Sequence, residues 1–391
     1  MVLDKIIFPF KNIQYVQDES IKPTIKRIGW FCTYVPEELI IASGFTPFRI
    51  TVNEKAKKAE GYFPINFCPF IKSSMEDLIS SSENLSGVVF TNSCDGMRRF
   101  YDTCKVYFSS IPSFLLDVPR IKSSLSLQHF TANLEQMVSF LENTGSKTVS
   151  GKIRAGDLEQ AIFICNAKRS LLEELDTCFK KLNKEIGVKN YFRILKLSMT
   201  AEPLSFIKEL KGYLNEIYQF NKKDFGNSLN NKSRHGYPEI MIIGNFIDEE
   251  RLWDIFDSLD CHISALDICS SERYFKRNLT ESSGFQENRY KKSVEELVKN
   301  IAQSHLYKPQ CMRMADLGGK ISEIKNSIEK NNIKGVIFIS QKFCDNTLLF
   351  YPFLREELNK IEIPSIFLEI EHRNFSAGQI KTRIQAFLEI I

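Results

Sequence analysis

The sequence has few of the features that would place it in a membrane, on nucleic acid or outside the cell. No apolar run approaches the roughly 20 residues that span a bilayer. The first residues, MVLDKIIFPFKNIQ, lack the long apolar stretch and small-residue cleavage site of a signal peptide. The 52 basic and 48 acidic side chains leave a net charge of +4, too small for a nucleic-acid footprint. We therefore expect a cytoplasmic protein that binds neither membrane nor nucleic acid.

Short motifs for common catalytic chemistries are also missing. The 5 histidines form no H-x-x-x-H or H-E-x-x-H arrangement, and there is no GxSxG, Walker loop or dinucleotide fingerprint. The 10 cysteines include no C-x-x-C pair of the kind found in zinc ribbons and ferredoxins. Any metal site must therefore be assembled from distant parts of the chain, and a structural zinc site has no evident fourth ligand.

The order of apolar and amphipathic stretches along the sequence predicts the fold class. A chain of 391 residues is long enough for two domains. Short apolar runs alternate with longer amphipathic stretches, as in parallel sheets covered by helices. We expect strands within residues 26–35, 46–52, 87–94, 106–116, 239–246, 262–268, 334–345 and 364–371.

Between these two groups of strands, residues 128–222 are rich in Leu, Glu, Lys and Asn at helical spacing, and residues 221–238 have the composition of a linker. The sequence therefore predicts an α/β protein with two open parallel-sheet units, Rossmann- or flavodoxin-like, around a helical segment. The expected domains are residues 1–127, 128–225 and 226–391.

Three cysteines have a similar sequence context. Cys94 and Cys344 directly follow very apolar strands, and Cys68 follows a turn and precedes a probable helix. Ligands of open parallel sheets bind beyond the carboxyl ends of the strands. Helix N-termini there favour thiolates and anionic clusters. From the residues alone two interpretations stay open: a metal or cluster site, or cysteines that serve as small buried side chains.

Several segments carry a resemblance to a known family. They cover residues 29–50, 66–74, 87–102, 157–169, 266–275, 334–358, 363–371 and 378–387, and the most diagnostic are CDGMRR, KFCD and GQIKTR. On these segments the chain resembles the 2-hydroxyacyl-CoA dehydratase D-component family, which includes benzoyl-CoA reductase subunits.

The resemblance implies a cofactor, a reaction and partners. Cys68, Cys94 and Cys344 would ligate a [4Fe–4S] cluster whose fourth iron is open or has a non-cysteine ligand. The implied reaction reduces the thioester of an (R)-2-hydroxyacyl-CoA to a ketyl radical and eliminates water to give the 2-enoyl-CoA. The implied partners are a homologous second subunit, or a second copy of this chain, and a separate ATP-hydrolysing iron–sulfur activator. The resemblance assigns no general base.

The resemblance also leaves alternatives. The chain could be a benzoyl-CoA reductase-type subunit, a double-cubane reductase with an [8Fe–9S] cluster, or a non-catalytic electron-transfer partner. Cys32 matches a C-x-x-V-P segment of the double-cubane proteins and is a possible ligand or cluster neighbour. The segment after TPFRI has no further cysteine, which counts against that alternative. Cys269 and Cys311 match places where relatives carry cysteine, and we interpret them as packing residues.

Charged residues near these cysteines have two interpretations each. Asp95 and Asp345 could orient the ligand loops or cap the following helices, and we favour the cap. Arg98, Arg99 and Lys72 could bind the phosphates of CoA or be solvent-exposed. Glu37 and Glu38 are candidates for proton transfer. Glu369 and Glu371 alternate along the last strand and are candidates to face the opening of the cluster site.

Overall fold

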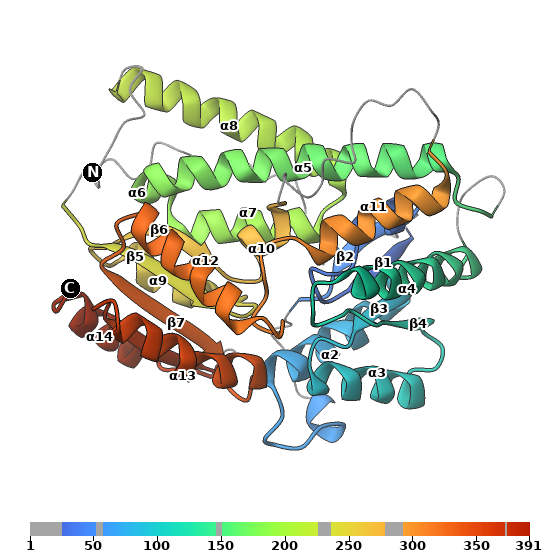
Figure 1. The fold of residues 1–391 in the computed structure, drawn as a ribbon, viewed down its shortest axis with the longest axis horizontal. Helices are drawn as coiled ribbons and strands as arrows, with labels where there is room; N and C mark the ends of the chain where they lie inside the picture. Colours follow the sequence, from blue (N-terminus) through green and yellow to red (C-terminus); the bar gives the residue numbers. More distant parts are fainter. Residues whose placement is uncertain (1–25, 52–57, 146–150, 226–235, 278–291, 372–373) are drawn as a thin grey trace.

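Two four-stranded parallel sheets organise the molecule (Figure 1). The computed structural model describes residues 26–51, 58–145, 151–225, 236–277, 292–371 and 374–391. The first sheet has the strand order β2-β1-β3-β4, and the second repeats the same pattern as β6-β5-β7-β8. The strands are β1 (Arg27–Trp30), β2 (Thr46–Arg49), β3 (Leu85–Thr91), β4 (Ser113–Leu116), β5 (Glu239–Gly244), β6 (His262–Asp267), β7 (Gly335–Gln341) and β8 (Ser365–Ile370). The predicted α/β class with two parallel-sheet units is confirmed.

Continuous apolar runs make the central strands. Every residue of β7 is buried, as expected for a parallel strand covered by helices on both faces. The strands β5 and β7 approach each other closely near their carboxyl ends. A Cβ at Gly244, the last residue of β5, would collide with the carbonyl oxygen of Ile339 in β7. Glycine therefore permits the close approach of these two strands.

Helices cover the sheets and connect them. They are α1 (Glu37–Ala42), α2 (Pro69–Ser81), α3 (Asp95–Tyr107), α4 (Ser124–Asn143), α5 (Ala155–Lys181), α6 (Asn183–Ile186), α7 (Val188–Thr200), α8 (Pro203–Phe225), α9 (Glu250–Asp257), α10 (Glu272–Phe275), α11 (Val294–Leu306), α12 (Leu317–Lys330), α13 (Asp345–Asn359) and α14 (Ala377–Leu388). Two short 3₁₀ helices cover Lys58–Gly61 and Ser82–Asn84.

Proline and glycine mark the two ends of α1. Pro36 is its N-cap, and Gly44 adopts a φ of 78° just after its end. Most of the expected linker, residues 226–235, lies outside the described residues. None of the helices in the described parts of the chain has the length and hydropathy of a membrane span.

The long helices pack the two halves of the chain together. Helix α5 runs along one side of the molecule in Figure 1, across both sheets, and α8 packs against it. Helix α11 comes from the C-terminal half of the sequence but packs against α4 and α5. One apolar core contains buried residues of β1, α5, β5 and α11, including Ile28, Leu172, Ile242 and Ile301. The two sheets are therefore held at a fixed distance by shared helices.

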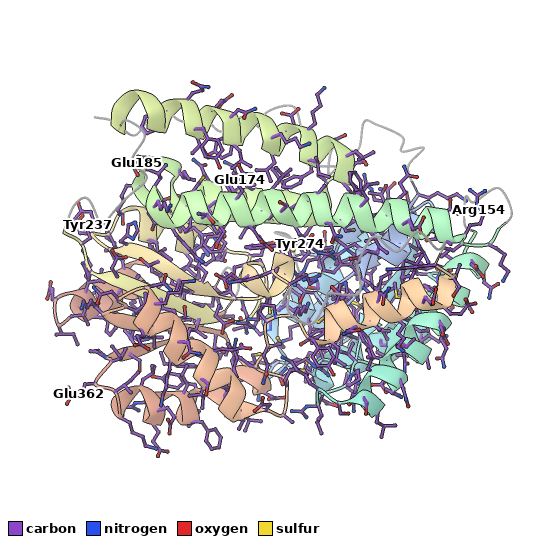
Figure 2. All side chains as sticks on the ribbon, turned by 45° about the horizontal axis from the view of Figure 1, so that its top comes forward. Arg154, Glu174, Glu185, Tyr237, Tyr274 and Glu362 are labelled. Carbon is purple, nitrogen blue, oxygen red and sulfur yellow. The ribbon has the colours of Figure 1, made fainter. Side chains whose placement is uncertain are left out.

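Buried ion pairs fix α1 against these helices. Lys168 of α5 pairs with Glu37 at 2.7 Å, and the hydroxyl of Tyr274 also donates to Glu37. Glu38 pairs with Arg169, and His305 lies 3.3 Å from the same carboxylate. Tyr274 lies beneath α5, in the middle of the molecule (Figure 2). Charges buried this deeply are stable only when they are paired and hydrogen-bonded.

We predict that Lys168→Met lowers the free energy of unfolding by about 3–5 kcal/mol, because it leaves the Glu37 carboxylate buried without its cation. Urea denaturation would measure the change. Lys360→Met removes a lysine from surface ion pairs with Glu356 and Glu357 and is the control, with an expected loss below about 1 kcal/mol. Equal losses in the two variants would contradict this account.

The imidazole of His305 makes stability depend on pH. Burial lowers the pKa of His305 to about 3, with a further lowering from the charge of Arg277. In the unfolded chain a histidine titrates near its ordinary value of about 6.5. The unfolded chain therefore takes up a proton between those values that the native protein does not. The contribution to stability is complete above about pH 6.5 and is lost as pH falls toward 3.

We predict that His305→Gln flattens the decline of unfolding free energy between pH 6.5 and 4.5, where this one group contributes up to about 1.4 kcal/mol per pH unit. Urea denaturation at several pH values would measure the slope. His129→Gln, at a half-exposed histidine, is the matched control. An unchanged slope in His305→Gln would show that other groups dominate the acid sensitivity.

Candidate metal centre

The three cysteines singled out from the sequence occupy the same structural position. Cys68, Cys94 and Cys344 are the N-cap residues of α2, α3 and α13. In α3 the Met97 N–H donates to the Cys94 sulfur at 3.4 Å. Helices α3 and α13 each begin just beyond the carboxyl end of a central strand, β3 and β7 respectively. Three positive helix termini therefore lie beside these thiols.

Packing of the surrounding helices brings the three cysteines together. A Cβ at Gly96, in the first turn of α3, would lie 2.5 Å from the δ-methyl group of Ile71 in α2. The missing side chain thus lets the Cys68 and Cys94 helices approach closely. Across the two units, the Asn346 side chain donates to the Ser93 carbonyl at 3.1 Å. That hydrogen bond joins the loop before Cys94 to the start of the Cys344 helix.

These residues border a cavity of about 120 Å³ between the two sheets. The carboxyl ends of both sheets face it, at the points where the strand order reverses, which is where parallel sheets bind ligands. Its apolar lining includes Phe31, Phe70 and Phe246. Six of the ten cysteines line the cavity, and all ten are free thiols: the six are Cys32, Cys68, Cys94, Cys269, Cys311 and Cys344.

The other three lining cysteines form a second group. Cys32 follows β1, Cys269 follows β6, and Cys311 lies between α11 and α12. The guanidinium of Arg273 lies between two of them, with its Nη1 3.7 Å from the Cys269 sulfur and 3.9 Å from the Cys311 sulfur. Six thiols therefore share one cavity.

Buried cations line the same cavity. Arg49, Arg273, Lys308 and Arg313 are each at most 2% exposed. Arg273 pairs with Asp267 at 2.7 Å. For Arg49, Lys308 and Arg313, no carboxylate oxygen of the described residues lies within ion-pair distance, and none of the described residues lining the cavity is acidic. The cavity is thus electropositive and rich in sulfur, which suits an anionic metal–thiolate group.

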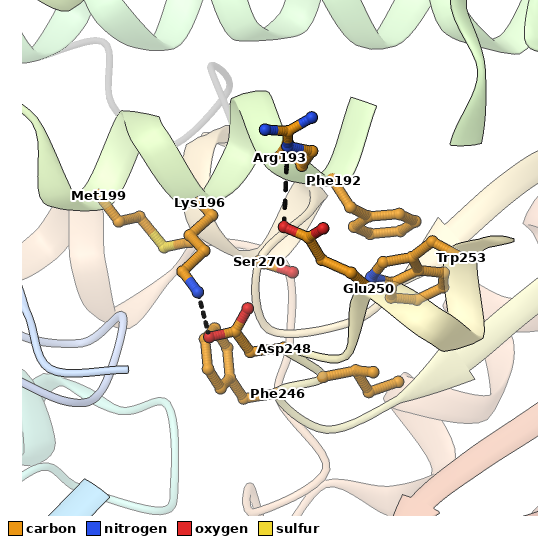
Figure 3. Close-up of a pocket in the computed structure, with 10 residues that line it drawn as sticks. Phe192, Arg193, Lys196, Met199, Phe246, Asp248, Glu250, Trp253 and Ser270 are labelled. Atoms are coloured by element: carbon orange, nitrogen blue, oxygen red, sulfur yellow. Dashed lines mark ion pairs between the residues drawn. The ribbon is translucent and has the colours of Figure 1, made fainter. Parts of the chain in front are cut away.

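A smaller cavity is lined by two residues that contact Arg49, namely Phe246 and Met199. It has a volume of about 20 Å³ and shares Phe246 with the cysteine cavity (Figure 3). The Arg49 guanidinium lies 3.9 Å from the centre of the Phe246 ring and donates to the Met199 sulfur. The ion pair of Lys196 with Asp248, at 2.8 Å, joins α7 to the loop after β5.

Burial opposes the expected thiolate character. It raises the pKa of Cys68 to about 12 and that of Cys94 to about 11, and the charge of Cys344 adds to both shifts. The helix termini do not outweigh desolvation, so thiolates here require a bound metal. Among the described residues, no three His, Cys, Asp or Glu side chains are grouped as ligands of a metal ion.

The predicted helix caps at Asp95 and Asp345 were wrong. Each aspartate is the first residue of its helix and is exposed, because the preceding cysteine occupies the N-cap position. Asp95 lies 3.9 Å from Arg99, four residues along α3. Neither aspartate lines the cavity.

The candidate phosphate-binding cations lie on the outside of α2 and α3. Arg98 and Arg99 are exposed, and Arg99 pairs with Asp102 at 2.9 Å. Lys72 is half-buried and donates to the Ile65 carbonyl at 2.7 Å. A contact with CoA stays a prediction for all three.

The candidate glutamates do not line the cavity. Glu37 and Glu38 belong to the buried ion pairs of α1. Glu369 is exposed, and Glu371 lies 3.6 Å from Lys342.

Cys269 and Cys311 have two structural roles. Both pack against the apolar core, as the sequence interpretation expected, and both also line the cavity. For Cys269 a signal existed, because it follows β6 just as Cys94 follows β3. Cys311 follows a helix, and no strand-end rule would have selected it. Nor did periodicity show that four cations from separate segments would be buried around the thiols.

Comparison with known proteins identifies the family. Residues 32–391 match the family described as "2-hydroxyglutaryl-CoA dehydratase, D-component". The chain belongs to the 2-hydroxyglutaryl-CoA dehydratase D-component family. The match includes all six cavity cysteines and confirms the resemblance inferred from the motif segments.

The curated relatives of this dehydratase family member match over nearly their whole length. The "(R)-phenyllactyl-CoA dehydratase beta subunit" of Clostridium sporogenes is 25% identical over 396 residues, covering 99% of each chain. The "(R)-2-hydroxyglutaryl-CoA dehydratase, subunit beta" of Acidaminococcus fermentans is 22% identical, covering 93% of this chain and 92% of the relative. A subunit of the benzoyl-CoA reductase of Thauera aromatica is 20% identical, covering 94% of this chain and 92% of the relative.

Proposed function

We propose that this chain is the iron–sulfur subunit of an enzyme that dehydrates (R)-2-hydroxyacyl-CoA thioesters to 2-enoyl-CoA, and that Cys68, Cys94 and Cys344 hold its [4Fe–4S] cluster. One observation carries the proposal: N-cap cysteines from both halves of the chain border a buried, cationic cavity free of described carboxylates. Relatives named as dehydratase beta subunits support the reaction class.

The residues of the cavity fit the chemistry of such a group. Thiolates are the ligands of iron–sulfur clusters, and the positive helix ends and buried cations offset the negative charge that thiolates bring. When bound, the cluster supplies an electron beside the thioester. The aromatic side chains of Phe31, Phe70 and Phe246 limit the access of water to this space.

The chain's own residues also suggest how the substrate would be held. Arg98 and Lys72 lie in the first turns of the helices that begin at Cys94 and Cys68. Cations at these places could contact the phosphates of CoA while the acyl end enters the cavity. Arg99 is a weaker candidate, because Asp102 and Asp95 already lie beside it.

The second group of thiols favours a second candidate function. With Cys32, Cys269 and Cys311 on the same cavity, six thiols are available, twice the number that one cluster with an open iron needs. Such a set could hold the larger [8Fe–9S] double-cubane cluster. The chain would then be an ATP-dependent reductase subunit, and the relative named as part of a benzoyl-CoA reductase is consistent with reductive chemistry.

The partners follow from the same comparisons. Relatives named as beta subunits imply a related second subunit, or a second copy of this chain in its place. Because no Walker loop is present in the sequence, the ATP-hydrolysing activator would be a separate iron–sulfur protein. We place this assembly in the cytoplasm, where thiols stay reduced.

Metal analysis tests the proposed cofactor. After anaerobic purification and cluster reconstitution we expect about four irons and four sulfides per chain for one [4Fe–4S] cluster, and about eight irons for the double-cubane alternative. Cys94→Ala and Cys344→Ala should each lose most of this iron. Cys104→Ala is the matched control, because Cys104 is buried on the same helix as Cys94 but does not line the cavity.

The second group is tested in the same way. If the cavity holds one cluster, Cys269→Ala and Cys311→Ala should keep about four irons. If it holds a double cluster, both variants should fall from about eight irons to four or fewer. Zinc in place of iron, or no metal in the wild-type protein, would refute the proposed function.

A dehydratase assay tests the reaction. The assay contains the cluster-loaded chain, its partner subunit, the activator, ATP and a reductant. We expect it to convert (R)-phenyllactyl-CoA or (R)-2-hydroxyglutaryl-CoA to the enoyl-CoA. The absorbance of the enoyl-CoA product measures the reaction. Reduction of an aromatic or enoyl thioester without dehydration would favour the reductase alternative.

A further inference from the structure

Lys308 is a buried lysine whose charge the protein does not balance. Its side chain is 1% exposed. The ammonium group donates to the carbonyl oxygen of Thr33 at 2.5 Å and to the Thr33 hydroxyl at 2.9 Å, and it lies 4.3 Å from the centre of the Tyr34 ring. All these partners are neutral. Within the described part of the chain, no carboxylate oxygen lies within ion-pair distance of the ammonium group.

Other buried lysines of this protein are balanced. Lys168 is 2% exposed and pairs with Glu37 at 2.7 Å. Lys320 is 3% exposed and pairs with Asp267 at 2.8 Å and with Glu323 at 3.4 Å. A buried ammonium without an anion is costly, so its retention calls for an anion from elsewhere.

The position of Lys308 indicates where that anion lies. Lys308 lines the cysteine cavity, and its hydrogen-bond partner Thr33 directly follows Cys32. Cys311 is three residues along the chain. Burial and the charge of Arg277 lower the pKa of Lys308 well below its ordinary value, so the ammonium form needs an anion beside it. Metal-bound thiolates in the cavity that Lys308 lines would supply this negative charge.

A fixed positive charge has a definite effect on a redox group in such a place. Reduction adds one negative charge to the bound group. In a site of low dielectric constant, a nearby cation stabilises the reduced form more than the oxidised form. The net charge around a cluster is one of the factors that set its reduction potential.

We propose that Lys308 is a positioning residue that balances the negative charge of the group bound in the cysteine cavity and thereby raises its reduction potential. This inference rests on the proposed function, because it requires an anionic cluster in the cavity. The proposal does not extend to Arg273, because the carboxylate of Asp267 already offsets the charge of its guanidinium.

The test is a reductive titration of the anaerobically reconstituted full chain, followed by electron paramagnetic resonance. Lys308→Gln removes the charge but keeps a donor for the Thr33 carbonyl. Lys308→Met removes both, and Lys308→Arg keeps the charge. Lys342→Met is the control: this lysine is two residues from Cys344, its side chain is 42% exposed, and solvent screens its charge.

We expect Lys308→Gln and Lys308→Met to shift the midpoint potential to more negative values by similar amounts. Lys308→Arg should stay close to wild type, and Lys342→Met should shift little. If Lys308→Met fails to fold, the comparison of Lys308→Gln with wild type tests the proposal by itself. An iron-loaded Lys308→Gln with the wild-type potential would overturn the inference and leave the proposed function standing. Wild-type protein without iron would overturn both.

Discussion

A charge buried in a protein needs an opposite charge close by, and this requirement distinguishes the two polar regions of the molecule. Behind α1 the chain supplies both signs: Glu37 with Lys168, and Glu38 with Arg169. In the cysteine cavity it supplies cations and thiols, and none of the described lining residues is acidic. The first region is complete by itself. In the function we propose, metal-bound thiolates supply the negative charge that the second region lacks.

The architecture explains why the thiols meet at this place. Both sheets have the same strand order, so each has one reversal point at its carboxyl edge. Shared helices hold these two edges against each other, and the cavity forms between them. Cys94 comes from one sheet and Cys344 from the other, so neither unit contains the site alone.

The buried ion pairs of α1 lie next to the cysteine cavity and connect its lining to the surrounding helices. Helix α1 follows the turn that begins at Cys32, and its glutamates are held by α5, α10 and α11. The Val35 N–H donates to the Cys32 carbonyl at 2.9 Å, which closes that turn. Lys308 holds the adjacent Thr33 from the opposite half of the sequence. These hydrogen bonds and ion pairs hold the turn at Cys32 against the helices around it.

The sequence by itself determined the class of the fold, because short apolar runs such as GVIFISQ that alternate with longer amphipathic stretches are typical of parallel strands covered by helices. It also determined which cysteines begin helices next to those strands: Cys94 and Cys344 stand at strand ends that apolar patterning locates. Only the tertiary structure decided that Cys311 and Lys308 border the same cavity. They lie on a loop whose local sequence carries no periodic signal, and they reach the site through the packing of α11 against the other half of the chain. Local patterning is fixed by neighbours in sequence, whereas the charge balance of a cavity depends on segments that meet only after the chain has folded.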